Sequence, residues 1–151
     1  MVSYEYHIRG SVTNLVRLIM GLKGTGKTKT LVELVRKAVD EEHGDVICIE
    51  KDKVLTYDIP YQARLVHASQ YGINSLELMR GFISGLAAGN FDITHVFIDN
   101  LFKIIGEVDA ETLASLLSWL EKFGEVEGIT FTVTVSADPA GYGEAVTKYI
   151  G

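Results

Sequence analysis

The sequence predicts an α/β fold in which βαβ units are arranged around a parallel sheet. Short apolar runs alternate with amphipathic segments along the chain, as in consecutive βαβ units. The run at residues 46–49 is apolar without alternation, which is typical of a parallel strand buried on both faces. The chain has 151 residues, 47% of them hydrophobic. We therefore expect one domain over residues 1–151, with residues 1–12 as a peripheral N-terminal extension.

Five apolar runs are expected to form the strands of this sheet. They lie at residues 15–20, 46–49, 65–68, 95–98 and 129–135. Pro60 argues against a central strand at residues 51–61, so a loop or a hairpin-like excursion is expected there. After residue 135 we expect a turn and a short terminal element.

Apolar residues at helical spacing predict three amphipathic helices between these strands. The first follows the segment at residues 21–28, the second is capped by Asn74 or Ser75, and the third begins at Asp109. A glycine is expected at or just beyond the end of each helix, in order Gly44, Gly89 and Gly124. The core-facing residues are Leu31, Leu34, Val35, Ala38 and Val39, then Leu76, Met79, Phe82, Ile83 and Leu86, then Leu113, Leu116, Leu117 and Leu120.

Composition and charge exclude several classes of function. The single cysteine, Cys48, rules out a disulfide framework and a cysteine-rich metal site, and its apolar neighbours predict a buried side chain. The N-terminus lacks the order of a signal peptide, and no apolar stretch approaches the roughly 20 residues of a membrane helix. We expect a soluble cytoplasmic protein without membrane contact. The net charge of −6 argues against broad binding of nucleic acid, although it leaves a local basic groove open.

Residues 21–28, Gly-Leu-Lys-Gly-Thr-Gly-Lys-Thr, match the pattern G-x-x-x-x-G-K-[ST] completely. An apolar strand precedes them and an amphipathic helix follows, which is the context that the pattern requires. Glycines let several N–H groups surround an anion, and the helix points its positive end at the same place. Lys27 supplies a cation for the β- and γ-phosphates, and the Thr28 hydroxyl is a natural Mg²⁺ ligand. The residues expected to bind nucleotide are Gly21, Leu22, Lys23, Gly24, Thr25, Gly26, Lys27, Thr28 and Lys29.

This glycine-rich loop (residues 21–28) resembles the Walker A motif of P-loop NTPases. Residues 95–99, His-Val-Phe-Ile-Asp, resemble the Walker B strand of the same family, so Asp99 would hold Mg²⁺ opposite Thr28. An acid at the carboxyl end of a parallel strand also lies where open α/β sheets bind ligands. The alternative for Asp99 is a helix or loop cap. His95 opens this strand at its far end, and we expect it to be a surface or packing residue.

The resemblance covers most of the chain and implies a three-layer α/β/α sandwich with a mainly parallel sheet, a RecA-like core. It also implies ATP and Mg²⁺ as cofactors. No Asn-Lys-x-Asp motif of the GTPase type is present in the sequence, which favours ATP over GTP. Partitioning ATPases related to septum-site proteins carry an extra lysine at the second loop position. Here that position is Leu22, and Lys23 stands one place later, so that branch does not match.

Hydrolysis depends on a residue that activates water. Many ATPases of the additional-strand group carry a glutamate directly after the Walker B aspartate, but this sequence has Asn100 there, which cannot accept a proton as a carboxylate can. In the RecA-like branch the glutamate ends the strand after the loop helix, which is the position of Glu50. The resemblance thus implies Lys27 and Glu50 as catalytic residues. The alternative for Glu50 is a solvated charge paired with Lys51 or Lys53.

Ser136, at the end of the last predicted strand, resembles the sensor position that touches the γ-phosphate or the attacking water. A plain turn before Pro139 is the alternative.

As a whole, the sequence resembles small stand-alone bacterial ATP-binding proteins that consist of little beyond this core and often lack an established role. We expect a Mg²⁺-dependent ATPase that hydrolyses the β–γ phosphoanhydride bond. Two alternatives stay open, a nucleotide-dependent binding module or switch with little hydrolysis, and a small-molecule phosphotransferase. A homo-oligomer or a protein partner is compatible with each of the three.

Overall fold

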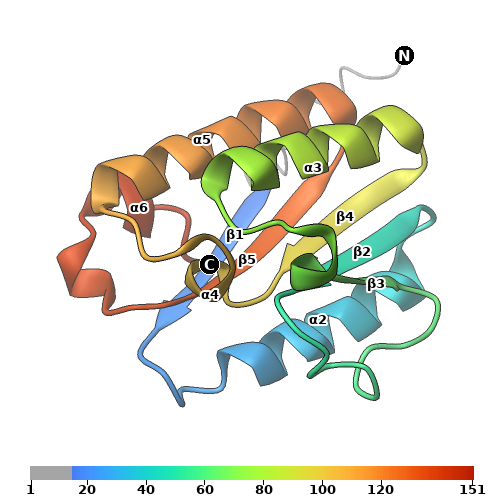
Figure 1. Ribbon diagram of the computed structural model, residues 1–151, viewed down its shortest axis with the longest axis horizontal. Coiled ribbons are helices and arrows are strands. Elements are labelled where there is room, and N and C mark those ends of the chain that lie inside the picture. Colours follow the sequence, from blue (N-terminus) through green and yellow to red (C-terminus); the bar gives the residue numbers. More distant parts are fainter. Residues whose placement is uncertain (1–14) are drawn as a thin grey trace.

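The computed structural model describes residues 15–151, which form a three-layer α/β/α sandwich around one sheet (Figure 1). The strands are β1 (Val16–Gly21), β2 (Asp45–Glu50), β3 (Arg64–His67), β4 (Ile93–Ile98) and β5 (Thr130–Ser136). Every pairing is parallel, and the order across the sheet is β1-β5-β4-β2-β3. The predicted fold class is therefore confirmed. The extension expected at residues 1–12 lies outside the described residues.

One long helix covers one face of the sheet and two cover the other. Helix α2 (Lys27–Glu41) lies opposite α3 (Leu76–Gly89) and α5 (Ala110–Glu127) (Figure 1). The chain crosses the sheet from β1 to β2 and returns from β3 through β4 to β5. Because crossovers between parallel strands are right-handed, the helices of the outward and return paths lie on opposite faces. The shorter helices are α4 (Leu101–Ile105) and α6 (Glu144–Thr147), with 3₁₀ turns η2 (Ala68–Tyr71) and η3 (Pro139–Gly141).

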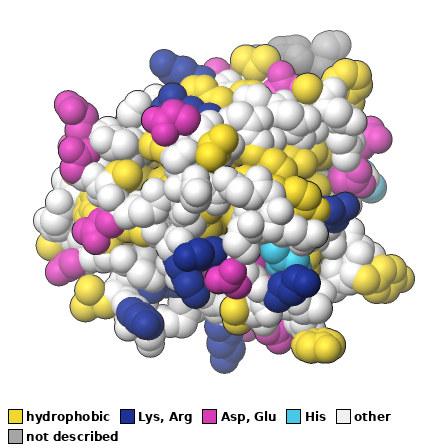
Figure 2. Space-filling model, in the orientation of Figure 1, with side chains coloured by type: hydrophobic (Ala, Val, Ile, Leu, Met, Phe, Trp, Pro, Cys, Tyr) yellow, Lys and Arg dark blue, Asp and Glu magenta, His cyan; other side chains and the backbone are white. Residues whose placement is uncertain are grey.

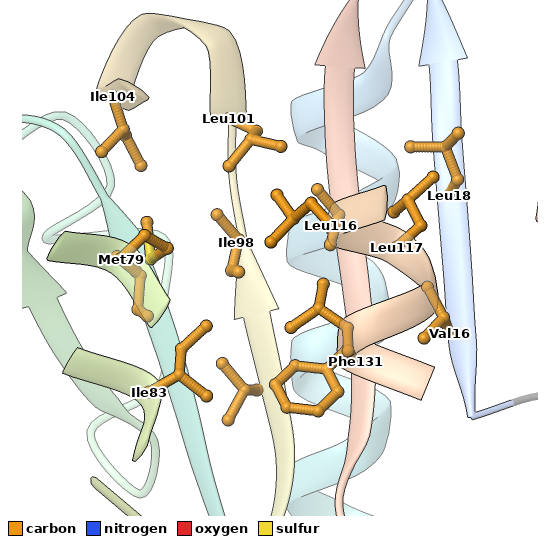
Figure 3. Close-up of a cluster of buried hydrophobic side chains, with 14 of the residues drawn as sticks. Val16, Leu18, Met79, Ile83, Ile98, Leu101, Ile104, Leu116, Leu117 and Phe131 are labelled. Carbon is orange, nitrogen blue, oxygen red and sulfur yellow. The ribbon is translucent and has the colours of Figure 1, made fainter. Parts of the chain in front are cut away.

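The larger hydrophobic core lies between the sheet and helices α3 and α5 (Figure 3). Leu116 and Leu117 of α5 point into the same cluster as Phe131 of β5, and Met79 and Ile83 of α3 complete it (Figure 3). A smaller core lies under α2, where apolar residues of the loop after β2 supplement the single helix. Its members include Leu31, Val35, Leu55, Ile59 and Phe97. The sheet is therefore covered by apolar side chains on both faces.

Two helices begin at the predicted capping residues. The Ser75 hydroxyl accepts a hydrogen bond from Leu78 N–H at 3.1 Å, and the Asp109 carboxylate accepts one from Thr112 N–H at 2.8 Å. Each bond satisfies one of the N–H groups that a helix start leaves without a partner. Gly89 is the last residue of α3, as expected.

The predicted role of Gly44 at the end of α2 is wrong. The helix ends at Glu41, and the backbone of Glu42 is already extended, so no left-handed residue is needed. A Cβ atom at Gly44 would instead clash with the Thr94 side chain and the Asp92 carbonyl. Gly44 is therefore required by the close approach of the chain to the start of β4.

The predicted position of Gly124 beyond α5 is also wrong, because the helix continues to Glu127. Gly128 ends it in the left-handed region, with a φ angle of 72°. A Cβ atom at Gly124 would clash with the Ile129 carbonyl, so this glycine lets the helix turn back closely onto β5. Helical spacing alone does not distinguish a terminal glycine from one that makes room for a neighbouring backbone.

The connections agree with most of the remaining predictions. Residues 51–61 form turns and bends without a strand. After β5 the chain forms η3 and α6, and Ile150 makes a parallel bridge with Leu18. Helix α4, five residues long, was not predicted. No helix within residues 15–151 is long and apolar enough to cross a bilayer. On the face that Figure 2 shows, Lys and Arg side chains are interspersed with Asp and Glu.

Candidate nucleotide-binding site

The glycine-rich loop leaves β1 at Gly21 and enters α2 at Lys27. Gly24 and Gly26 lie in the left-handed region, with φ angles of 86° and 84°, which other residues adopt only at a cost. A Cβ atom at Gly21 would lie 3.0 Å from Thr25 Oγ1, so this position is also tight. Gly26 offers no side chain to cap the first N–H groups of α2. Those groups are free to bind an anion, together with the positive end of the helix.

Lys27 lies across the loop that precedes it. Its Nζ donates a hydrogen bond to the Leu22 carbonyl at 2.8 Å and lies 3.5 Å from Thr25 Oγ1. The Thr25 hydroxyl itself donates to the Leu22 carbonyl at 2.8 Å. The ammonium group is thus held over the exposed loop, where the phosphates of a nucleotide would lie. Lys23 is exposed and lies outside these contacts.

Thr28 and Asp99 are 71 residues apart in the sequence and meet at the carboxyl ends of the strands. Thr28 Oγ1 lies 3.2 Å from Asp99 Oδ1 and 3.1 Å from Asp99 Oδ2. Asp99 directly follows β4 and is 8% exposed, while Thr28 lies in the first turn of α2. The predicted pair is therefore brought together. Asp99 caps neither α4 nor a loop N–H, since the N-cap residue of α4 is Asn100.

A hydroxyl and a carboxylate are hard oxygen ligands of the kind that Mg²⁺ prefers. Within residues 15–151 no group of three or more His, Cys, Asp and Glu side chains could hold a metal ion by itself. Thr28 and Asp99 thus fit a Mg²⁺ ion that takes its remaining ligands from phosphate and water, which is how Mg²⁺ usually binds with nucleotides.

Thr134 is a site residue that the sequence analysis missed. It is 1% exposed, and its hydroxyl donates a hydrogen bond to Asp99 Oδ1 at 2.8 Å. The available signal was the alternation in β5, where Thr130, Thr132 and Thr134 alternate with large apolar residues. Polar residues at every second position of a buried strand indicate a polar face.

Asn100 has an unusual backbone for a residue with a side chain. Among residues 15–151 it is the only non-glycine with a positive φ, at 55°. Its N–H donates to Thr134 Oγ1 at 2.7 Å. Asparagine is one of the few residues that tolerate this region, and such strain concentrates at functional sites. This backbone turns the chain sharply after Asp99 into helix α4.

Glu50 ends β2, which pairs with β4, so it lies on the strand next to the one that ends before Asp99. Glu50 is 4% exposed, and its carboxylate accepts hydrogen bonds from Val54 N–H at 3.1 Å and from Leu55 N–H at 3.1 and 3.2 Å. His67 Nδ1 lies 3.3 Å from Glu50 Oε2, but the geometry is not that of a hydrogen bond. The alternative of a solvated charge paired with a lysine is wrong, because Glu50 is buried and holds the loop at residues 51–55.

Ser136 ends β5 next to the start of the glycine-rich loop. It is paired in register with Gly21, and the following Ala137 N–H donates to the Gly21 carbonyl at 3.0 Å. The side chain is half-buried. A sensor role for Ser136 stays a prediction.

His95 packs at the opposite end of β4, as predicted. Its Nδ1 lies 2.8 Å from Glu42 Oε2, its Nε2 lies 2.8 Å from Thr132 Oγ1, and its ring stacks on Phe97. Burial by itself would raise the pKa of Glu42. The hydrogen bond and charge of His95, with a hydrogen bond from Thr94, outweigh burial and lower that pKa below its ordinary value. This pair ties the end of α2 to β4.

Cys48 is fully buried in β2, as predicted. Burial raises the pKa of its thiol far above the usual value, and the nearby Asp99 and Glu50 carboxylates add to this effect. The thiol is therefore inert, and Cys48 serves as a small apolar residue.

The strand order and the loop together define the class of this fold. β5 lies between the strand that enters the glycine-rich loop and the strand that ends at Asp99, which is the additional-strand arrangement. The fold is that of a RecA-like P-loop NTPase core.

The comparisons with known proteins add little to this assignment. No family model and no curated protein matches the chain. Among solved structures it is similar to the crystal structure of Pif1 helicase from Candida albicans, with 16% identity and a TM-score of 0.45. That similarity covers 100% of this chain and 38% of the helicase chain. It is too remote to carry an argument about function, so the assignment of the fold rests on the topology and the loop.

Proposed function

We propose that this protein binds ATP with Mg²⁺ at the glycine-rich loop and hydrolyses the β–γ phosphoanhydride bond. The observation that carries the proposal is the contact of Thr28 Oγ1 with both oxygens of Asp99, at 3.1 and 3.2 Å, directly beside a loop whose N–H groups are free for an anion. A phosphate group bound without a metal ion would need only the N–H groups of the loop. A buried carboxylate added at this point favours a phosphate–metal complex over a simple anion.

Each residue has a stated role in this proposal. The loop N–H groups and Lys27 bind the phosphates and stabilise the negative charge that develops during transfer. Thr28 and Asp99 would hold Mg²⁺, which would supply positive charge to the phosphate groups. Glu50 orients the attacking water and accepts its proton, as the water oxygen bonds to the γ-phosphorus and the bond to the bridging oxygen breaks to release ADP. For this role Glu50 must become accessible to water, because it is 4% exposed beneath the loop whose Val54 and Leu55 N–H groups it binds.

The second candidate function is a nucleotide-dependent switch with little hydrolysis. Two observations favour it. The Glu50 carboxylate is buried and accepts hydrogen bonds from the loop at residues 51–55, and the residue after Asp99 is Asn100, which cannot act as a base. Nucleotide binding would then act on that loop without fast turnover.

The proposal is tested with the Lys27→Ala variant. A lost charge-assisted contact of about 2 kcal/mol corresponds to roughly 30-fold weaker binding. We therefore expect Lys27→Ala to weaken Mg²⁺–ATP binding by at least that factor, measured by titration with a fluorescent ATP analogue. Phosphate release should fall to the background rate.

Lys37→Ala is the matched control, because Lys37 is exposed on the same helix but lies outside the loop. Equal binding by both variants would contradict the proposed site. Tight Mg²⁺–ATP binding by the wild type without phosphate release would leave the switch as the function.

A further inference from the structure

Thr134 joins the two residues that follow β4. Its hydroxyl donates to Asp99 Oδ1 at 2.8 Å and accepts from Asn100 N–H at 2.7 Å. A hydroxyl carries one proton. Thr134 donates this proton to Asp99, and a lone pair of the same oxygen accepts the hydrogen bond from Asn100 N–H. With Thr134 1% exposed, water does not compete for either bond. One buried side chain therefore fixes the Asp99 carboxylate and the left-handed backbone of Asn100 together.

The two hydroxyl groups around Asp99 differ in setting. Thr28 approaches both carboxylate oxygens from an exposed helix start at 3.1 and 3.2 Å, whereas Thr134 holds Oδ1 alone from a buried central strand. The terminal torsion of an aspartate is broad, so the carboxylate turns readily unless a partner holds it. The bond from Thr134 restricts that rotation and keeps both carboxylate oxygens within reach of the Thr28 hydroxyl.

We propose that Thr134 is a positioning residue of this site, which sets the Asp99 carboxylate for Mg²⁺–ATP. The inference rests on the proposed function, since it concerns the same metal–nucleotide complex. Groups that orient the ligands of a metal typically change its affinity 10- to 100-fold when they are removed. Thr134 meets the structural requirement for such a group because it is buried and hydrogen-bonded to Asp99, the proposed metal ligand.

Thr132 offers a matched control on the same strand. It lies two residues earlier on the same face of β5, is 2% exposed, and has its hydroxyl 2.8 Å from His95 Nε2. Thr132→Val and Thr134→Val therefore remove the same hydroxyl from the same kind of environment. They differ in the residue that loses a hydrogen bond, which is His95 near the start of β4 for Thr132→Val and Asp99 after its end for Thr134→Val.

The experiment measures the Mg²⁺ dependence of nucleotide binding. Wild type, Thr134→Val, Thr134→Ser and Thr132→Val are titrated with Mg²⁺ at a fixed concentration of a fluorescent ATP analogue. Mn²⁺ binding is followed separately by electron paramagnetic resonance in the presence of ATP. We expect Thr134→Val to need about 10-fold more Mg²⁺ or Mn²⁺ for half-saturation. Thr134→Ser, which keeps the hydroxyl, should restore the wild-type value, and Thr132→Val should retain it.

A Mg²⁺ dependence of Thr134→Val equal to that of Thr132→Val would overturn the inference. If Thr134→Val does not fold, Thr134→Ala is measured in its place, with the same expectation and the same contradicting result. Wild-type protein that binds no Mg²⁺–ATP would overturn the proposed function itself. A wild type that binds normally, with Thr134 variants like it, would remove only the positioning role.

Discussion

Asp99 and Glu50 are both buried carboxylates at the same end of the sheet, but their partners differ. Asp99 receives two hydroxyl groups, from Thr28 and Thr134, whereas Glu50 receives backbone N–H groups of the loop that follows it. The Thr28 hydroxyl can rotate when a metal binds, whereas backbone N–H groups move only with the chain. We infer that Asp99 is ready for its role, and that Glu50 acts only if the loop at residues 51–55 rearranges.

This difference leads to a prediction for Glu50→Gln. The substitution keeps the shape and one hydrogen-bond acceptor but removes the charge, so we expect Mg²⁺–ATP binding to change less than about threefold. The rate of phosphate release should fall about 100-fold or more, since a group that activates water typically contributes at least that much. Lost bonding to the loop should cost about 1 kcal/mol of unfolding free energy. Binding titration, phosphate release and urea unfolding measure the three quantities.

Glu42→Gln is the control for this prediction, because Glu42 is a hydrogen-bonded carboxylate at the opposite end of the sheet. It should leave phosphate release unchanged. If Glu50→Gln retains the wild-type rate, Glu50 does not activate water and its role is to hold the loop.

At the scale of single elements, the helices pack against the sheet through backbone as well as side chains. Gly124 in α5 allows the Ile129 carbonyl to approach, and Gly128 reverses the chain into β5. In α3, Gly85 is exposed, and a Cβ atom there would have nothing within 4 Å. A side chain at Gly124 would therefore clash with a neighbouring backbone, whereas one at Gly85 would meet open space.

We therefore expect opposite effects on stability from the same substitution. Gly85→Ala should raise the free energy of unfolding by about 0.5–1 kcal/mol, because alanine favours the helix and restricts the unfolded chain. Gly124→Ala should lower it by about 1–3 kcal/mol, because the added methyl group forces α5 away from the Ile129 carbonyl. Urea unfolding of both variants tests this. A stabilising Gly124→Ala would show that α5 does not pack as closely as described.

At the scale of the whole molecule, the two ends of the sheet have different tasks. The glycine-rich loop, Asp99, Glu50 and Ser136 gather at the carboxyl ends of four parallel strands, where open α/β sheets bind ligands. The pair of His95 and Glu42 lies at the other end and connects α2 with β4. In the proposed function, the groups that bind nucleotide are therefore separated along the strands from this stabilising pair.

This arrangement predicts that nucleotide stabilises the whole fold. A ligand at 100 times its dissociation constant adds about 2.7 kcal/mol by mass action. For a domain of this size that corresponds to a rise in melting temperature of roughly 5–10 °C. Thermal unfolding with and without Mg²⁺–ATP measures the shift, and Lys27→Ala should abolish it. A shift of equal size in Lys27→Ala would mean that the nucleotide binds elsewhere.

The sequence by itself determined the parallel α/β fold, the glycine-rich loop and its partner Asp99. These depend on local patterns, namely a strand, a loop and a helix in series, and on the rule that parallel strands end at one edge. What it could not determine is where close backbone approaches occur, as the misplaced Gly44 and Gly124 illustrate.

Only the tertiary structure decided which groups surround the two carboxylates. Thr134 reaches Asp99 because Ile98 is paired with Val133, and a shift of that register by one residue would turn Thr134 to the opposite face. Glu50 is bound by Val54 and Leu55 because the chain turns back after β2. Strand register and loop conformation arise from contacts between distant segments, so no local pattern encodes them.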